Sequence, residues 1–463
     1  MNQVFVRYIS IVSLAVFLLT ACKVTEPYRV PENLPLQSYR DQAATDTNTI
    51  ATIPWNRYFT DTILQRHLAA GLDQNLNLQM AYQRITQARA YFNQSKAAFL
   101  PTLNANAGVT TSKLSEAQGF GIRTHADQFS LGLSTSWEAD IWGRLKSSKK
   151  ASLASLLQTE AAANALRTGL VADIASLYYL LMALDDQLEI TRQTVVNWDT
   201  TVQTMMELKE AASVTQAAVV QSEAQRYAAE VTIPDLKQSI RETENTLSIL
   251  LGREPGFIER SKLFGQLMPD MMQTGVPAQL LANRPDVQQA ELGLRYYFEM
   301  TNVARTYFYP SLTINGSAGQ QALQFSKLFD PSSFAASIGA GLLQPIYNRR
   351  LNKTRLEVAK SQQQEALFGF RNTVLNAGRE VSDALSLYAT AGEKIVIRSK
   401  QMQALEKSVE YSEELLKNGF ANYTEIITAR QSLLLAELGR VNDRLQQLQS
   451  GVNLYRALGG GWR

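Results

Sequence analysis

The chain has 463 residues, of which 45% are hydrophobic and 19% charged, and its 45 Lys and Arg against 42 Asp and Glu leave a net charge of +3. This length exceeds what one ordinary hydrophobic core supports, and the absence of a basic block argues against nucleic-acid binding. A single cysteine excludes a disulfide framework and a zinc site of several thiolates. Two histidines, His67 and His125, leave little material for metal or triad chemistry. We therefore expect no catalytic residues, no cofactor and no metal ligands.

The first 21 residues have the features of an export signal, because a basic residue precedes an apolar run too short for a comfortable membrane span. The run ends in Leu19-Thr20-Ala21-Cys22, which resembles a bacterial lipoprotein box. That resemblance implies cleavage before Cys22 and acylation of its thiol and new amino terminus. An ordinary signal peptide followed by a chance cysteine is the alternative. Lys23 stands where an aspartate would retain a lipoprotein at the inner membrane, so we expect an outer-membrane anchor.

Two halves of the chain repeat the same order of landmarks. The pairs are Ala98–Leu103 with Tyr307–Leu312, Ile141–Arg144 with Ile346–Arg349, and Leu251–Gly252 with Leu458–Gly459. The shift is roughly 205 to 209 residues, too long for a solenoid period, and indicates a tandem duplication. We expect repeats over 61–252 and 283–463, an extended segment over 22–60, and an equatorial linker over 253–282.

Each half contains two segments in which apolar and polar residues alternate, as in Leu103-Asn104-Ala105-Asn106. The expected strands cover about 101–113, 127–138, 311–323 and 333–343. Period two over about ten residues is typical of a transmembrane β-strand, although a half-buried strand of a soluble sheet has the same pattern. The export signal and the aromatic residues near the strand ends favour the membrane interpretation.

The remainder is predicted to be helix. The expected helices cover about 61–98, 144–210, 214–250, 285–307, 349–417 and 423–457. Apolar spacings of three and four residues form coiled-coil seams, as in Leu177, Leu181, Leu184 and Leu188. Pro234 should kink the third helix near Ile233.

Four strands cannot close a barrel, and lipid tolerates no open sheet edge, so the chain must pool strands with copies of itself. Two copies would give eight strands and three would give twelve, and both numbers are even. The long helices beneath such strands would form a tube. This arrangement predicts an intermembrane conduit.

Several motifs in order resemble the TolC/OprM outer-membrane factor family, specifically its lipoprotein (NodT-like) branch. They are the stretch from Trp55–Phe59 through Asn75-Leu76, then Trp137–Arg144, Leu281–Val287 with Glu291, and Asn453–Trp462. The resemblance covers essentially the whole mature chain. It implies a mainly α fold with a small antiparallel β part, in which a homotrimer closes one twelve-stranded outer-membrane barrel above a helical tube and an equatorial belt. It also implies a non-catalytic efflux duct fed by a periplasmic adaptor and an inner-membrane pump, and this branch resembles partners of proton-driven RND pumps.

In related channels an Asp-x-x-Arg pattern after the second-half tip rings the periplasmic constriction. Alignment places Thr428 at the Asp position and Gln431 at the Arg position, so this chain departs from the pattern. We hypothesise that Thr428 and Gln431 line the gate and that Glu425, three residues earlier, supplies a negative ring. Arg430 belongs to the same candidate gate. Alternatively, Glu425 and Arg430 are only surface or interface charges.

The turns between paired helices are the expected adaptor-docking tips. They contain Ala212, Ser213 and Val214 in the first half, and Gly419, Phe420 and Ala421 in the second. Two rival functions share parts of this pattern. A lipid-anchored periplasmic coiled-coil scaffold would need no strands compatible with lipid, and an envelope hydrolase would need a nucleophile–base or metal cluster that does not emerge.

Overall fold

The computed structural model describes residues 24–31, 39–40, 49–113, 115, 117, 125–267, 275, 279–420 and 422–463. The predicted signal peptide over residues 1–21 and the predicted anchor Cys22 lie outside the described residues. The chain divides into two compact units. Unit 1 comprises Met1–Glu32, Arg84–Thr159 and Ala290–Phe370, and unit 2 comprises Asn33–Gln83, Glu160–Gln289 and Arg371–Arg463. Each unit therefore contains parts of both sequence repeats.

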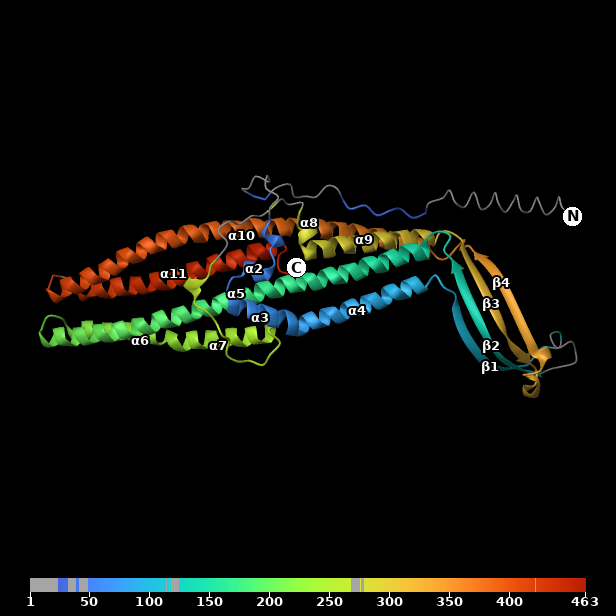
Figure 1. Ribbon diagram of the computed structural model, residues 1–463, viewed down its shortest axis with the longest axis horizontal. Coiled ribbons are helices and arrows are strands. Elements are labelled where there is room, and N and C mark those ends of the chain that lie inside the picture. The colour runs from blue at the N-terminus through green and yellow to red at the C-terminus, as the bar shows by residue number, and fades with distance from the viewer. Residues whose placement is uncertain are drawn as a thin grey trace. The chain divides into compact units, whose positions relative to one another are not determined.

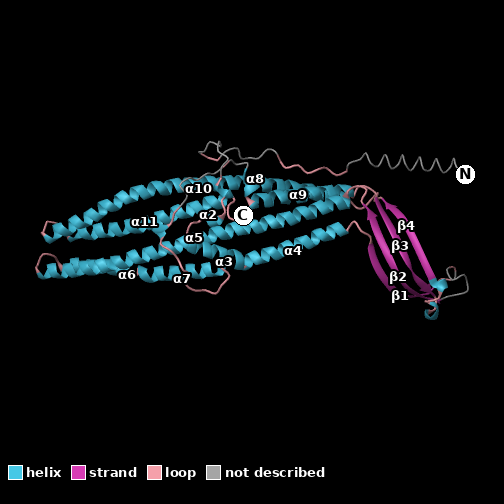
Figure 2. Cartoon of the chain, viewed as in Figure 1, coloured by secondary structure: helices cyan, strands magenta, loops and turns pink. Residues whose placement is uncertain are grey.

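Unit 1 is built around one four-stranded antiparallel sheet in the order β1-β2-β3-β4 (Figures 1 and 2). The strands are β1 Thr102–Lys113, β2 His125–Ala139, β3 Ser311–Ala322 and β4 Phe334–Leu343. The central β2–β3 ladder joins a strand of the first repeat to a strand of the second. Among the described residues, no further strand pairs with the outer edges of β1 and β4. The sheet and the surrounding helices confirm the predicted mainly α fold with a small antiparallel β part.

Strand register separates the sheet into an apolar and a polar face. Leu133 lies opposite Ala105 on β1 and Ala318 on β3, whereas the next residue, Ser134, lies opposite Asn104 and Ser317. Residues directly opposite each other in a ladder share a face, so the alternation continues from strand to strand, with Gln320 of β3 as an exception opposite Leu131 and Phe334. One face suits lipid and the other water, as in a membrane-spanning barrel strand.

The passage from β2 into α5 (Arg144–Glu210) is a tight, capped turn. The Asp140 carboxylate accepts hydrogen bonds from the backbone N–H groups of Leu145 (2.8 Å) and Lys146 (2.9 Å). Gly143 has φ +77°, a conformation that favours glycine. The Trp142 indole N–H donates to the Pro310 carbonyl oxygen at 2.7 Å, next to β3. Trp142, Gly143 and Arg144 therefore form the turn between strand and helix.

Helices make up the rest of the described chain. In unit 1 the sheet connects to α9 (Pro285–Thr306), to α10 (Leu351–Lys417) and to the end of α4 (Leu76–Ala97), and α4, α5, α9 and α10 all continue into unit 2. Unit 2 contains two helical hairpins, α5 with α6 and α10 with α11 (Figure 1). The second helices of these hairpins are α6 Gln216–Glu230 and α11 Tyr423–Ala457. The remaining elements of unit 2 are α2 Trp55–Tyr58, α3 Thr62–Gln74, α7 Thr232–Leu250, α8 Leu280–Asn283 and the short 3-10 helices η1 Ile50–Thr52 and η2 Leu263–Gly265. The 3-10 helices η4 Phe325–Lys327 and η5 Pro331–Ser333 lie between β3 and β4.

Two expected continuous helices are interrupted. The helix expected over 61–98 breaks at Asn75, whose side-chain amide donates to the Leu250 carbonyl oxygen at 2.9 Å while its oxygen accepts from the Leu78 N–H at 3.0 Å. The helix expected over 214–250 breaks at Val231, close to the kink that Pro234 predicts, because proline removes one helical hydrogen bond and clashes with the preceding turn.

The end of each repeat is locked in the same way. Gly252 and Gly459 have φ +69° and +94°, and each follows a helix that ends in a turn hydrogen bond. A Cβ at Gly252 would lie 2.3 Å from the Gln74 carbonyl oxygen, and a Cβ at Gly459 would lie 2.3 Å from the Asn283 carbonyl oxygen. Only glycine fits either position, so the duplication persists in the packing of the folded chain.

Candidate functional site

The predicted docking residues lie in the two hairpin turns of unit 2. Ala212, Ser213 and Val214 occupy the first turn, between α5 and α6, and Gly419 and Phe420 occupy the second, between α10 and α11. Ala421 lies outside the described residues. We call these turns tip 1 (residues 211–215) and tip 2 (residues 418–422).

Both tips close with the same pair of backbone hydrogen bonds. In tip 1 the Ala212 N–H donates to the Lys209 carbonyl oxygen (2.9 Å) and the Ser213 N–H to the Leu208 carbonyl oxygen (2.8 Å). In tip 2, Gly419 and Phe420 make the corresponding bonds to carbonyls of α10, at 3.1 and 2.9 Å. These are Schellman motifs, which require a left-handed residue at the turn. Ala212 has φ +57° and Gly419 has φ +74°.

The tip side chains differ in what they present. Ala212, Ser213, Gly419 and Phe420 are exposed, and the Phe420 ring stands 82% exposed. Val214 is half-buried and packs inward. The tips therefore offer one turn of small side chains and one turn carrying an exposed aromatic ring.

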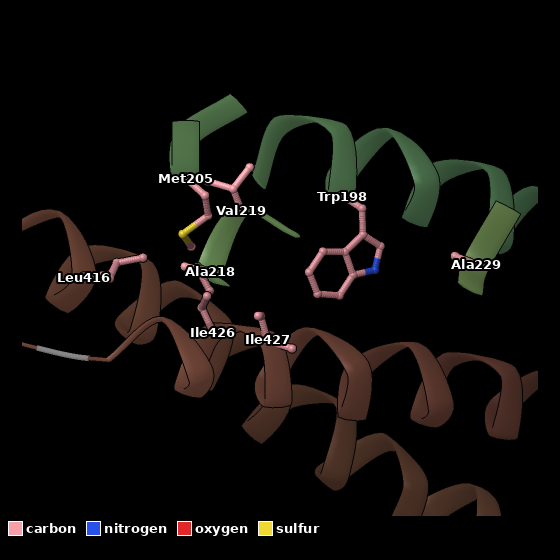
Figure 3. Close-up of a cluster of buried hydrophobic side chains, with 8 residues drawn as sticks. All are labelled: Trp198, Met205, Ala218, Val219, Ala229, Leu416, Ile426 and Ile427. Atoms are coloured by element: carbon pink, nitrogen blue, oxygen red, sulfur yellow. The ribbon is translucent and has the colours of Figure 1, made fainter. Parts of the chain in front are cut away.

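A buried hydrophobic cluster joins the two hairpins just behind the tips. Figure 3 shows the Trp198 ring lying between the ribbons of the first and second hairpins. The cluster consists of Trp198, Met205, Ala218, Val219, Ala229, Leu416, Ile426 and Ile427, with Val214 and Tyr423 among the side chains packed against it. Sequence reasoning did not single out Trp198, because an apolar residue on a helix seam gives no sign of which neighbouring helix it will contact.

Three of the four candidate gate residues share one exposed stripe of α11. Glu425, Thr428 and Gln431 are exposed, while the intervening Ile426 and Ile427 are buried in the cluster. Spacing of three residues places the three polar side chains along one side of the helix. The Thr428 hydroxyl donates to the Thr424 carbonyl oxygen at 2.8 Å, so its hydrogen is used within its own helix.

Arg430 points elsewhere. Its side chain is 17% exposed, forms an ion pair with Glu413 of α10, and donates to the Asn197 carbonyl oxygen of α5 at 3.2 Å. One guanidinium thus connects three helices and both hairpins. The structure does not bring Arg430 into the stripe of Glu425, Thr428 and Gln431.

Arg430 and Glu413 border a groove of about 210 Å³ between α5, α10 and α11. Glu437 also lines it. Burial raises the pKa of the Glu437 carboxyl, Arg440 opposes that rise, and Glu406 adds to it. No cluster of three or more metal-ligating side chains occurs in the part of the chain that the structure describes.

The match to a known protein family has the same two repeats as the sequence. The family model described as outer membrane efflux protein matches residues 69–253 and again 276–460. The two matches are displaced by about 207 residues, the shift found between the sequence landmarks.

Curated relatives match along nearly their whole length. The chain is 30% identical to outer membrane protein OprJ of Pseudomonas aeruginosa, covering 96% of this chain and 94% of OprJ. It is 25% identical to the probable outer membrane lipoprotein SilC of Salmonella typhimurium, covering 96% and 97%. It is 26% identical to the cation efflux system protein CusC of Escherichia coli O157:H7, covering 96% and 97%.

Solved structures share the fold. The outer-membrane channel OprN superposes with a TM-score of 0.88 at 23% identity, covering 95% of this chain and 100% of OprN. A membrane protein from Pseudomonas aeruginosa superposes with a TM-score of 0.87 at 27% identity, covering 95% and 98%.

Proposed function

We propose, since this chain belongs to the outer membrane efflux protein family, that the pump feeding it is a proton-driven transporter of the RND class. The chain is an outer-membrane exit duct of a tripartite efflux system and not an enzyme. Members of the family are homotrimeric channels that work with a periplasmic adaptor and an inner-membrane pump. The observation that carries the function is the full-length match of both repeats, strands included, which a pore-free scaffold would not need.

The RND assignment rests on the lipoprotein-branch motifs. Crosslinking of intact envelopes, followed by purification of the tagged chain and mass spectrometry, tests it. We expect an adaptor and an RND transporter among the companions. An ATP-driven transporter in their place would overturn the assignment while leaving the duct intact.

We propose that Cys22 carries the lipid anchor. The Leu19-Thr20-Ala21-Cys22 box supports it, and the relative SilC is described as a lipoprotein. Mass spectrometry of the amino-terminal peptide should show a mature chain beginning at Cys22 with acyl groups attached. A mature terminus elsewhere, or an unmodified Cys22, would refute the proposal.

We propose that the periplasmic gate is formed by the exposed stripe of α11, with Glu425 as its negative ring and Thr428 and Gln431 beside it. Arg430 acts as a positioning residue that holds this helix against α5 and α10. Glu425→Gln should lower the cation preference of the channel, and Glu410→Gln, at an exposed position of α10, is the matched control. Equal cation preference in the wild type and Glu425→Gln would exclude the charged ring.

We propose that the adaptor docks on both tips, at Ala212, Ser213 and Val214 and at Gly419, Phe420 and Ala421. Gly419→Trp should abolish efflux without lowering trimer yield. Because Gly419 has a positive φ, Phe420→Glu supplies a second variant that leaves the backbone unstrained. Phe257→Glu, an exposed phenylalanine outside the tips, is its control. Full efflux by both tip variants would exclude this docking surface.

A further inference from the structure

The helices α5 and α10 follow strands β2 and β4 in unit 1, and their first three turns are rich in basic residues (Figure 1). Neither helix has an acidic residue in its first turn. The basic residues are arginines and lysines, and the two kinds lie on different sides of their helices. They are Arg144, Lys146, Lys149 and Lys150 on α5, and Lys353, Arg355 and Lys360 on α10.

The two arginines face the polar side of the sheet. Arg144 forms an ion pair with Glu138, in which Arg144 Nε donates to Glu138 Oε1 at 2.8 Å. Glu138 belongs to the polar face, because it is four residues from Ser134 on β2. Both guanidinium groups also lie over the Tyr307 ring, at 5.8 Å from its centroid for Arg144 and 4.6 Å for Arg355. The polar face of a barrel strand is turned to water, so both arginines face the interior of the channel.

The five lysines lie on the opposite side of each helix. On α5, Lys146 is two residues from Arg144, and on α10, Lys353 is two residues from Arg355. Two residues correspond to about 200° of rotation, so both lysines point away from the interior, to the side of the apolar face of the sheet. The other three lysines are three, four or seven residues from these two and share their side. We call the set the collar lysines, which are Lys146, Lys149, Lys150, Lys353 and Lys360.

The collar lysines carry more positive charge than neighbouring carboxylates neutralise. Lys150 pairs with the buried Glu299 at 3.5 Å, and Lys353 pairs with Glu357 at 4.0 Å. The other three are exposed, and no carboxylate of the described part of the chain forms an ion pair with them. They are Lys146, Lys149 and Lys360. Positive charge in the first turns also opposes the helix dipole, whose amino-terminal end is positive, so an anion outside the chain would relieve both unfavourable terms.

The collar lysines lie close to the level at which the membrane-spanning strands end. Lys149 Nζ is 5.9 Å from the centroid of the Phe99 ring, and Phe99 is three residues before β1. Lys146 and Lys150 are about 3 and 9 Å along the axis of α5, and the head-group layer of a bilayer leaflet is roughly 5–7 Å thick. Side chains of an α-helix lean towards its amino terminus, which is the end of α5 and of α10 nearest the strands. The flexible lysine stems therefore carry their ammonium groups towards the head groups.

We propose that the collar lysines are a docking surface for anionic phospholipid head groups of the periplasmic leaflet of the outer membrane. The phosphate of such a lipid supplies the negative charge that the exposed lysines and the two helix starts lack. The collar continues the apolar face of the sheet, so one lipid molecule contacts the strands with its acyl chains and the lysines with its head group. In a homotrimer of the family type, the surface is repeated three times around the barrel.

Native mass spectrometry of the purified full-length trimer tests the docking. The trimer is first equilibrated with equal amounts of phosphatidylglycerol and phosphatidylcholine, and the wild type should retain phosphatidylglycerol in preference. A collar variant with Lys146→Gln, Lys149→Gln and Lys360→Gln should lower the retained ratio of the two lipids at least about five-fold, because each lysine near an anionic surface adds to the attraction. An unaltered heat-modifiable gel shift shows that the variant barrel remains folded.

A charge-matched variant supplies the control. Lys400→Gln, Lys407→Gln and Lys417→Gln remove three exposed lysines of α10 in unit 2, so this variant has the same net charge as the collar variant. Its lipid ratio should equal that of the wild type. Raising the salt concentration from about 0.1 M to about 0.5 M should lower the ratio of the wild type and leave that of the collar variant unchanged, because salt screens exposed charges.

Two single substitutions test which side of the helices binds the lipid. Lys146→Gln removes a charge from the collar, and Arg355→Gln removes a charge from the interior side. Only Lys146→Gln should lower the lipid ratio, by about two-fold or more. Equal losses in the two variants would contradict the assignment of the lipid to the outer side.

Equal preference for phosphatidylglycerol in the wild type and the collar variant would overturn lipid docking. Loss of a crosslinked periplasmic protein from the collar variant in intact envelopes, with its lipid preference unchanged, would assign the collar lysines to a protein interface and would overturn the proposal as well.

Discussion

The two helix tips form the same type of turn from different residues. Both close with Schellman hydrogen bonds, but tip 2 places Gly419 at the left-handed position and tip 1 places Ala212 there. The helix after tip 2 begins with Asn422, whose side chain accepts from the Thr424 N–H at 3.3 Å. The helix after tip 1 begins with Thr215, whose side chain makes no capping hydrogen bond.

Tip 1 is therefore the weaker turn by its own sequence, and it depends on what packs behind it. A left-handed residue other than glycine destabilises a turn by roughly 1–2 kcal/mol. A cap residue whose side chain makes no hydrogen bond to the helix lacks a stabilisation of about 1 kcal/mol. The shared hydrophobic cluster, against which Val214 of tip 1 packs, offsets that deficit. Tip 1 is held mainly by its neighbour hairpin, whereas tip 2 is also held by its own residues.

The largest expected effect is the loss of the shared cluster. Trp198→Ala should lower the local opening free energy of both tips by about 3–5 kcal/mol, because it leaves a cavity between the hairpins. Hydrogen exchange of the backbone amides around both tips measures it. Val196→Ala, at an exposed position of the same helix, is the control. A loss of protection restricted to one tip would contradict the shared role.

The next effect concerns the connection made by Arg430. Arg430→Met removes its ion pair with Glu413 and its bond to the Asn197 carbonyl, and should cost about 2 kcal/mol, between the values for exposed and fully buried pairs. Hydrogen exchange along α11 reports the change. Lys407→Met, on the exposed surface of α10, should have no such effect. If the two variants behave alike, Arg430 does not position the helix.

The helix caps give a matched pair of smaller changes. Asn422→Ala should lower the opening free energy of tip 2 by about 1 kcal/mol, since it removes a working cap. Thr215→Ala removes no capping bond and should leave tip 1 within error of the wild type. Amide exchange in the first turns of α11 and α6 distinguishes them, and comparable losses at both caps would remove the contrast drawn between the tips.

Exchanging the left-handed residues should reverse that contrast. Ala212→Gly should stabilise tip 1 by about 0.5–1 kcal/mol and Gly419→Ala should destabilise tip 2 by a similar amount. The same exchange measurement applies to both variants. Unchanged protection of tip 1 in Ala212→Gly would show that the turn bears no strain.

The smallest effect depends on pH. Because burial raises the pKa of Glu437 in the folded chain, its charged form costs stability above that pKa, and stability should rise as pH falls towards the ordinary glutamate value. Glu437→Gln should raise the apparent melting temperature at pH 8 and remove this rise on acidification. Parallel pH profiles of the variant and the wild type would contradict the assignment.

Much of the fold could be predicted from the sequence because its signals are local and periodic. Two-residue alternation identifies strands with one apolar and one polar face, and seams of leucine identify long helices. The break at Asn75 could not be predicted, because it depends on the Leu250 carbonyl, 175 residues later. The inward turn of Arg430 likewise depends on helices that are distant in sequence.

For the candidate site, too, one part could be predicted from the sequence and another part could not. The turns were predictable from Gly419 and from the pairing of the repeats. The sequence alone did not show which α11 side chains are exposed, because that depends on the position of the cluster. Glu425, Thr428 and Gln431 can be separated from Arg430 only when the neighbouring helices are in place.

Single-channel recording of the purified trimer in planar lipid bilayers tests the central claim most directly. The account predicts discrete ion-conducting steps with a preference for cations that weakens in Glu425→Gln. A folded, membrane-inserted trimer that conducts no current under any voltage would contradict an exit duct.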